Sequence, residues 1–141
     1  MNRFCALVLI LFLAHIASAK EEEMLACVTV YWSTGSNGDR AHATGARLRT
    51  GHCAVDPTKI PYGSKVIFPD AECVAVDTGP AVVSRKSARY CGRTAAQKKA
   101  IVIDRFFETK RQALAWAQAH PRFMTVRVIP PGSPSEPKGP W

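Results

Sequence analysis

The stretch "CVAVDTGP" at residues 73–80 is an apolar run that ends in an aspartate, which a Thr-Gly pair and a proline follow. The run repeats an earlier pattern, "CAVDP" at 53–57, and a third run, "IVID" at 101–104, also ends in an aspartate. Aspartate is uncommon inside strands and common in turns, so any one of these residues alone predicts only a turn cap. Together the runs predict three strands that end in carboxylates: Asp56, Asp77 and Asp104.

The surrounding segments also have the patterns of short strands. Residues 28–32 ("VTVYW") and 123–129 ("FMTVRVI") alternate in polarity, and "KVIF" at 65–68 follows a Pro-Tyr-Gly turn. The segment "ATGARLR" at 43–49 and the following "HCAVD" indicate a further stretch of short strand. About six or seven short strands predict a mainly β fold, a small β-barrel rather than a doubly wound sheet.

Three segments are predicted to be helical. Residues 84–92 have Ser84 as an N-cap and Gly92 as a stop, whereas 94–100 and 109–120 each open with the Thr-x-x-Gln capping box. In the last of these helices, the residues predicted on the buried face are Ala113, Leu114 and Ala117.

The two ends of the chain have other patterns. Residues 1–19 contain an apolar run and an Ala-Ser-Ala site, which predict a secretory signal peptide cleaved near Ala19 and a periplasmic or extracellular product. The run is shorter than a membrane span of roughly 20 residues, so no membrane span is expected. Residues 20–129 form one domain that begins with a polar leader at 20–23, and the proline-rich 130–141 predicts a disordered tail. We expect a monomer.

The cysteines of the exported chain predict disulfides. Their even count in an oxidising compartment favours two bonds, and three pairings stay open. The intervals of 26, 20 and 18 residues contain no C-x-x-C pair, so neither a zinc site nor any other metal or cofactor is predicted. The four residues are Cys27, Cys53, Cys73 and Cys91.

The charge indicates an attraction to polyanions. The formal net charge is +8, and it becomes +7 once Arg3 leaves with the signal peptide. The cations are scattered rather than interleaved with aromatic residues along one stripe, so nucleic-acid binding is not predicted. A solvated basic surface explains the charge equally well.

Three blocks of sequence resemble the three-aspartate domain, or 3D domain, of membrane-bound lytic transglycosylase A and stationary-phase wall-lytic proteins. The blocks are "AVDPTKIPYGSKV" at 54–66, "AVDTGPAV" at 75–82 and "VIDRFF" at 102–107, supported by "VTVYW" and "ATGARL" upstream. The resemblance covers about 105 residues. It implies a six-stranded double-psi β-barrel in which the strand-end carboxylates meet at one groove.

The resemblance also implies roles for single residues. Asp104 corresponds to the catalytic third aspartate, Asp77 to its hydrogen-bonding neighbour and Asp56 to the first aspartate near the groove. The substrate-binding set is completed by Thr29, Tyr31, Thr44 and Gly79, although strand alternation and a Thr-Gly turn explain the first three equally well. Trp32 is either a sugar-stacking or a buried ring, and His42 and His52 are either bases of another hydrolytic chemistry or solvated loop residues.

The implied activity is cleavage of the β-1,4 bond between N-acetylmuramic acid and N-acetylglucosamine in peptidoglycan, with the muramyl 6-hydroxyl closing onto C1. One carboxyl group then serves as acid and afterwards as base. The apolar neighbours of Asp104 and the nearby Asp77 are expected to raise the pKa of Asp104.

One departure keeps other functions open. Asp77 and Asp104 lie 27 residues apart, whereas the family pattern separates them by about eleven, and the extra segment is rich in cations. The alternatives are a non-catalytic polysaccharide-binding or expansin-like wall-loosening module, and an envelope interaction module that docks on an anionic partner.

Overall fold

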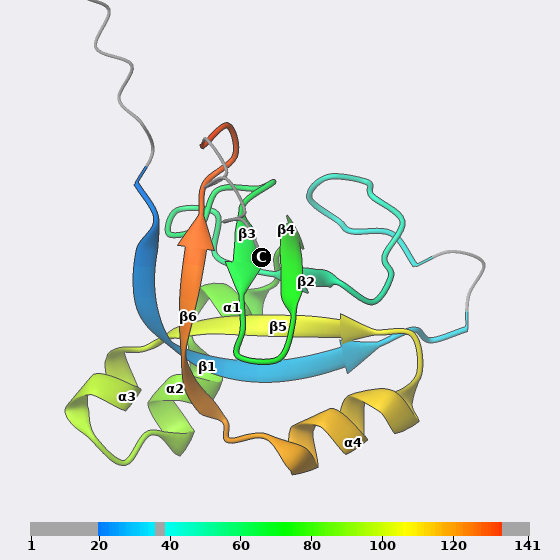
Figure 1. Ribbon diagram of the computed structural model, residues 1–141. Helices are drawn as coiled ribbons and strands as arrows, with labels where there is room; N and C mark the ends of the chain where they lie inside the picture. The colour runs from blue at the N-terminus through cyan, green and yellow to red at the C-terminus, as the bar shows by residue number, and fades with distance from the viewer. Residues whose placement is uncertain (1–19, 36–38, 134–141) are drawn as a thin grey trace, which may run out of the picture.

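The computed structural model describes residues 20–35 and 39–133, which fold around a closed six-stranded barrel (Figure 1). The strand order around the barrel is β1-β5-β2-β4-β3-β6. The prediction of a small, mainly β barrel with short helices is confirmed. The strands are β1 (Glu22–Trp32), β2 (His52–Ala54), β3 (Lys65–Ile67), β4 (Glu72–Asp77), β5 (Ile101–Phe107) and β6 (Phe123–Ile129).

Two strand pairs in the barrel are parallel, β1 with β5 and β2 with β4, and the other four are antiparallel. This mixed arrangement is compatible with a double-psi barrel. The repeated Cys-Ala/Val-Asp phrases occupy the parallel pair β2 and β4, with Cys53 opposite Ala75. The repetition in sequence therefore corresponds to two strands that lie side by side and run in the same direction.

Strand alternation divides the apolar residues into two layers. Residues such as Val28, Val66, Ile103 and Val126 fill the barrel interior and are almost fully buried. The opposite faces of β1, β2 and β5 carry a second cluster, to which Val82 and Ala88 of the helical insertion contribute. The barrel is therefore packed both from within and from one outer side.

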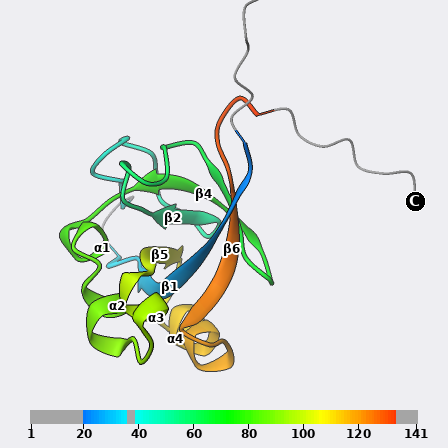
Figure 2. The ribbon, with the colours of Figure 1, turned by 90° about the vertical axis from the view of Figure 1, so that its left-hand side faces the viewer.

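The helices gather on one side of the barrel (Figure 2). They are α1 (Pro80–Val83), α2 (Lys86–Cys91), α3 (Ala95–Lys99) and α4 (Lys110–Ala119). The capping boxes predicted at Thr94 and Thr109 are both formed, with each threonine hydroxyl accepting from the amide three residues later. The insertion between β4 and β5 thus covers the outer layer of apolar residues rather than the barrel ends.

Two helix predictions are corrected. The helix expected at 84–92 is formed as α2 and ends at the predicted Gly92, but it begins two residues later, because Ser84 ends α1 and Arg85 adopts a left-handed conformation with φ 54°. The buried face of α4 consists of Ala113 and the half-buried Trp116, whereas Leu114 is 41% exposed. Both deviations follow from tertiary packing, which overrides local helix signals.

The termini also differ in part from the expectation. The predicted polar leader is ordered from Lys20, and Glu22 and Glu23 already pair with Val128 and Arg127 of β6. The predicted signal peptide at 1–19 lies outside the described residues, as does 134–141 of the predicted tail, while 130–133 form a turn. Among residues 20–35 and 39–133, no helix has the length and apolarity to cross a membrane.

Cys27, Cys53, Cys73 and Cys91 are free in this structure, whereas the sequence predicts two disulfides among them. Cys53 and Cys73 both point into the barrel, but Cys53 lies opposite Ala75 rather than Cys73. Burial, and then the neighbouring thiol of Cys73, raises the pKa of Cys53, so the two thiols lie near each other. Cys27 faces the outer layer, and the exposed Cys91 accepts a hydrogen bond from Arg122.

A buried arginine connects three elements of the barrel and its surroundings. Arg105 on β5 is only 4% exposed, and its Nη1 donates to both carboxylate oxygens of Asp70 at 3.1 Å. Asp70 lies in the turn between β3 and β4 and also accepts from the indole nitrogen of Trp116 at 2.8 Å. The guanidinium carbon lies 4.6 Å from the ring centroid of Phe68 and 4.5 Å from that of Trp116. One cation therefore joins β5, the β3–β4 turn and α4.

We predict that Asp70→Asn lowers the free energy of unfolding by about 3 kcal/mol, because it leaves the buried guanidinium of Arg105 without its counter-charge. Chemical denaturation monitored by tryptophan fluorescence measures the change. The control is Glu72→Gln, since the Lys65–Glu72 pair is 3.6 Å apart and 52% exposed on both sides. The control should change stability by less than about 0.5 kcal/mol, and equal losses in the two variants would contradict a special role for the buried pair.

Candidate functional site

A single row across four neighbouring strands brings the two principal aspartates together. Thr29 on β1 lies opposite Asp104 on β5, Asp104 lies opposite Ala54 on β2, and Ala54 lies opposite Asp77 on β4. With strands about 4.8 Å apart, the two aspartate backbones are separated by roughly 10 Å. The small side chain of Ala54 lies between them, so the row leaves open space over the sheet where both carboxylates can act on one ligand.

A β-bulge places Asp77 in this row. The parallel register of β2 and β4 shifts between Cys53 and Ala54, so that Ala54 pairs with Asp77 rather than with Val76. Because side chains alternate along a strand, a one-residue shift changes which face of the sheet a residue shares with its partner. Bulges are frequent beside functional sites for this reason. Without the shift, Asp77 would share the face of the interior residues Cys73 and Ala75.

Asp104 is the carboxyl group with the most perturbed acidity. The pKa of Asp104 is raised from its ordinary 3.8 to about 6, mainly by burial; the hydrogen bond from Thr29 lowers this pKa, and the negative charge of Asp77 contributes to raising it. That hydrogen bond runs from the Thr29 hydroxyl to Oδ1 of Asp104 and measures 2.9 Å. A carboxyl group with this pKa can both donate and accept a proton near neutral pH.

Asp77 is held by two donors on its two oxygens. The Tyr31 hydroxyl donates to Oδ2 at 3.3 Å, and the backbone amide of His42 donates to Oδ1 at 3.0 Å. Burial, followed by the charges of Asp77 and Asp104, raises the pKa of Tyr31 far above its ordinary value, so the phenol keeps its proton. The ring of Tyr31 packs edge-on against Phe106, at a centroid distance of 5.2 Å. Asp77 is therefore fixed in orientation, whereas Asp104 has a single protein hydrogen bond.

The two aspartates line one cavity of about 340 Å³, which we call the acid cavity. Its volume lies in the range of small-molecule sites. Trp32 forms part of the wall, and Lys110 lies over the ring of Trp32 with its ammonium 5.8 Å from the centroid. The first residues of α1 contribute another part of the wall, so the insertion borders the cavity without separating Asp77 from Asp104.

The other predicted residues divide into those at the cavity and those away from it. Tyr31 and Gly79 line the acid cavity. Thr44 does not line it, and its hydroxyl instead donates to the carbonyl of Val76 at 2.7 Å, which ties the 41–48 loop to β4. Asp56 does not line the acid cavity either. Its Oδ1 accepts hydrogen bonds from both the amide and the hydroxyl of Thr58. For Asp56 the geometry is that of a turn cap.

Sequence reasoning missed one carboxylate at this site. Asp39 lines the acid cavity together with Arg40 and Leu48, and its backbone carbonyl accepts from the amide of Leu48. The sequence predicts only a short strand at 43–49 beyond this residue, whereas the structure has a loop with an isolated bridge between Arg40 and Arg47. The sequence signal for this site is the Asp39-Arg40 pair, which lies between two turn segments.

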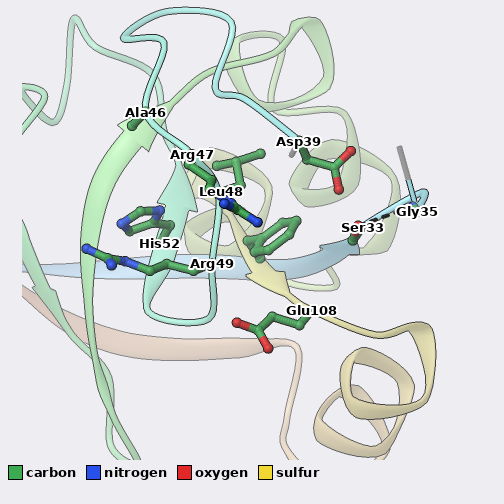
Figure 3. Close-up of a pocket in the computed structure, with 10 residues that line it drawn as sticks. Ser33, Gly35, Asp39, Ala46, Arg47, Leu48, Arg49, His52 and Glu108 are labelled. Carbon is green, nitrogen blue, oxygen red and sulfur yellow. Dashed lines mark hydrogen bonds between the residues drawn. The ribbon is translucent and has the colours of Figure 1, made fainter. Parts of the chain in front are cut away.

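A larger cavity of about 860 Å³ adjoins the acid cavity and shares Asp39, Leu48 and Phe106 with it (Figure 3). Because it contains Arg47 and Arg49, we call it the arginine cavity. Over the described parts of the chain, no group of three or more histidine, cysteine, aspartate or glutamate side chains is placed to hold a metal ion. The titratable and charged groups that line the two cavities are carboxyl groups, the phenol of Tyr31, the imidazoles of His42 and His52, and arginines.

No protein-family model matches the chain, and no curated protein matches it. The resemblance to the three-aspartate domain therefore depends on the sequence blocks at 54–66, 75–82 and 102–107 and on a barrel that is compatible with that family's fold.

We predict that Asp104→Asn stabilises the protein at pH 7.5. Asp104 ionises near pH 6 in the folded protein and near pH 3.8 in the unfolded chain. Its ionisation therefore lowers the free energy of unfolding progressively as the pH rises from 3.8 to 6, and the full loss is present above pH 6. The amide carries no charge to desolvate and can still accept from Thr29. Unfolding should require about 1 to 3 kcal/mol more at pH 7.5, and much less extra at pH 4.

Urea unfolding at the two pH values measures this difference. An equal change at pH 4 and pH 7.5 would show that the stabilisation does not arise from the charge of Asp104.

Proposed function

We propose that this protein is an exported peptidoglycan-cleaving enzyme of lytic-transglycosylase type and a divergent relative of the three-aspartate domain family. The observation that carries the proposal is the half-buried Asp104, whose pKa is raised to about 6 beside the oriented carboxylate of Asp77 in one cavity. A general acid for glycosidic cleavage needs a carboxyl group that is still protonated near neutral pH.

In the proposed reaction, protonated Asp104 donates its proton to the glycosidic oxygen, and the bond from that oxygen to C1 of the muramyl sugar breaks. The muramyl 6-hydroxyl oxygen then bonds to C1, and its proton passes to the carboxylate of Asp104. The enzyme regains its starting state, no water is consumed, and the product ends in a 1,6-anhydro sugar. A single carboxyl group therefore serves in both proton transfers.

Asp77 supports this chemistry without transferring a proton. Its negative charge raises the pKa of Asp104 and also favours the positive charge that develops at C1. Tyr31 and the amide of His42 hold the carboxylate in place before substrate arrives, so its orientation costs little at the moment of reaction. The half-buried ring of Trp32 provides an apolar surface for a sugar face in the same cavity.

A second candidate function is docking of the protein on an anionic envelope component. Residues 78–103 contain six cations and no carboxylate, and helices α1 to α3 present this segment on one side of the barrel (Figure 2). Such a surface attracts polyanions at long range. Docking and cleavage are compatible, because the cations lie on α2, on α3 and beside them, and none of these cations lines the acid cavity.

We predict that the protein from residue 20 onward releases muropeptides ending in 1,6-anhydro-N-acetylmuramic acid from peptidoglycan, and that Asp104→Asn abolishes release. The amide preserves the shape of the carboxyl group but can neither give nor take the proton. Chromatography with mass spectrometry identifies the products. Asp56→Asn is the matched control, since Asp56 caps a turn away from the cavity, and it should retain activity.

Two other outcomes would contradict the mechanism. Products with an ordinary reducing end would show hydrolysis, and binding of glycan without any product would favour the non-catalytic polysaccharide-binding barrel.

We further predict opposite pH shifts in two variants. Activity should fall as the pH rises through about 6, because Asp104 loses the proton that it donates. Thr29→Val removes a hydrogen bond that lowers the pKa of Asp104, so the falling limb of kcat/KM should move to higher pH. Asp77→Asn removes a charge that raises the same pKa, so the limb should move to lower pH and the rate should fall. Shifts in the same direction would exclude Asp104 as the titrating acid.

A further inference from the structure

The arginine cavity extends the groove beyond the site of cleavage. It shares Asp39, Leu48 and Phe106 with the acid cavity, so a ligand can occupy both without leaving the groove. At about 860 Å³ it is the larger of the two cavities, and the reaction proposed above uses none of its charged side chains. The cavity therefore has room for a part of the substrate that does not react.

Charges of both signs line this cavity. Arg47 and Arg49 come from the segment before β2, and Asp39 and Glu108 lie across from them (Figure 3). The salt bridges in the described parts of the chain join Lys65 to Glu72, Arg105 to Asp70 and Arg127 to Glu21. None of the four charged side chains of the arginine cavity is in such a pair. Two cations and two anions thus face one cavity without pairing with each other.

His52 lies beside Arg49 on the same wall (Figure 3). Burial, and then the charge of Arg49, lowers the pKa of His52, so the ring is neutral at neutral pH. The positive charge of this wall accordingly comes from the two arginines. Guanidinium groups bind carboxylates in a planar, two-bonded geometry, which favours carboxylates as their ligands.

We propose that the arginine cavity binds the peptide carried by the glycan, with peptide carboxylates at Arg47 and Arg49 and a free peptide amine facing Asp39 and Glu108. The proposal rests on the proposed function, and it adds that the substrate is peptide-substituted glycan. A purely acidic polysaccharide fits less well, because its charges would be repelled by Asp39 and Glu108. A neutral glycan would leave all four charged groups without a counter-charge.

The first experiment compares two substrates of the full exported chain: peptide-bearing glycan strands, and the same strands after an amidase has removed the peptides. The wild-type protein should cleave the peptide-bearing strands with a kcat/KM about ten-fold higher or more, as expected for one or two charge-assisted contacts. The double variant Arg47→Gln/Arg49→Gln should lose this preference while keeping its rate on strands without peptides.

A matched control removes two charges elsewhere. Lys98→Gln/Lys99→Gln alters α3, which contributes no residue to either cavity, and it should keep the preference. Equal cleavage of both substrates by the wild-type protein would overturn the proposal. So would an equal loss on both substrates in the double arginine variant.

A second experiment separates this proposal from the proposed function. Isothermal calorimetry measures the binding of a synthetic N-acetylated tetrapeptide of alanine, glutamate, lysine and alanine, which has two carboxylates and one amine. Binding should weaken about ten-fold in the double arginine variant. Acetylating the lysine amine should weaken binding to the wild type more than binding to Glu108→Gln, because the variant has already lost one of the two carboxylates that the amine faces.

These results hold whether or not the protein cleaves glycan. If no strand is cleaved but the peptide binds with this charge dependence, the cleavage reaction is wrong and the peptide site stands. If strands are cleaved and the peptide does not bind, the peptide site is wrong and the cleavage reaction stands.

Discussion

The burial of Arg105 inside the barrel is the interaction on which the rest of the structure depends. Its guanidinium is paired with Asp70 and enclosed by the rings of Phe68, Phe107 and Trp116, so β5 cannot slip by one residue without exposing apolar rings or burying an unpaired charge. Because side chains alternate along a strand, the inward direction of Arg105 fixes the outward direction of Asp104. A structural cation on one face of β5 thus positions an acid on the other.

The position of Asp104 makes its ionisation costly in the folded protein, and the same cost raises its pKa. The environment that raises the pKa of Asp104 also makes its ionised form unfavourable in the folded protein at neutral pH. The surrounding barrel, packed from inside and from the helical side, offsets that cost. A more polar surrounding would give a more stable carboxylate but a weaker acid near neutral pH. Strain of this electrostatic kind is a frequent feature of active sites.

The sequence predicted those features that follow from local patterns. Six strands, two capping boxes and the strand-end positions of Asp77 and Asp104 all follow from alternation, turn residues and the Thr-x-x-Gln motif. The features that it could not predict depend on contacts between distant segments. The bulge that turns Asp77 outward exists only in the pairing of β2 with β4, and the even number of cysteines does not show that Cys27 and Cys53 face opposite sides of the sheet.

Asp56 is a second case in which the local sequence pattern did not predict the position of a side chain. Its sequence context closely matches that of Asp77, since both follow a Cys-to-Asp apolar run, yet Asp56 continues into a turn and satisfies Thr58. No pairing partner brings it into the row formed by Thr29, Asp104, Ala54 and Asp77. The two similar motifs therefore place their aspartates differently, because the β-bulge between β2 and β4 brings only Asp77 into the row.

The same reasoning removes the difficulty posed by the 27-residue step from Asp77 to Asp104. Strand register, and not the length of the connection, sets the spacing of the two carboxylates, because each is placed by its pairing with Ala54 on β2. Longer connections cost little extra entropy, since each doubling of loop length costs about 0.6 kcal/mol. The insertion is consequently free to vary in length and composition while the carboxylates keep their places. The insertion changes the wall of the acid cavity, to which α1 contributes, and the charge of the adjoining surface. Under the proposed function, the insertion would therefore affect which glycan binds rather than which group acts as the acid.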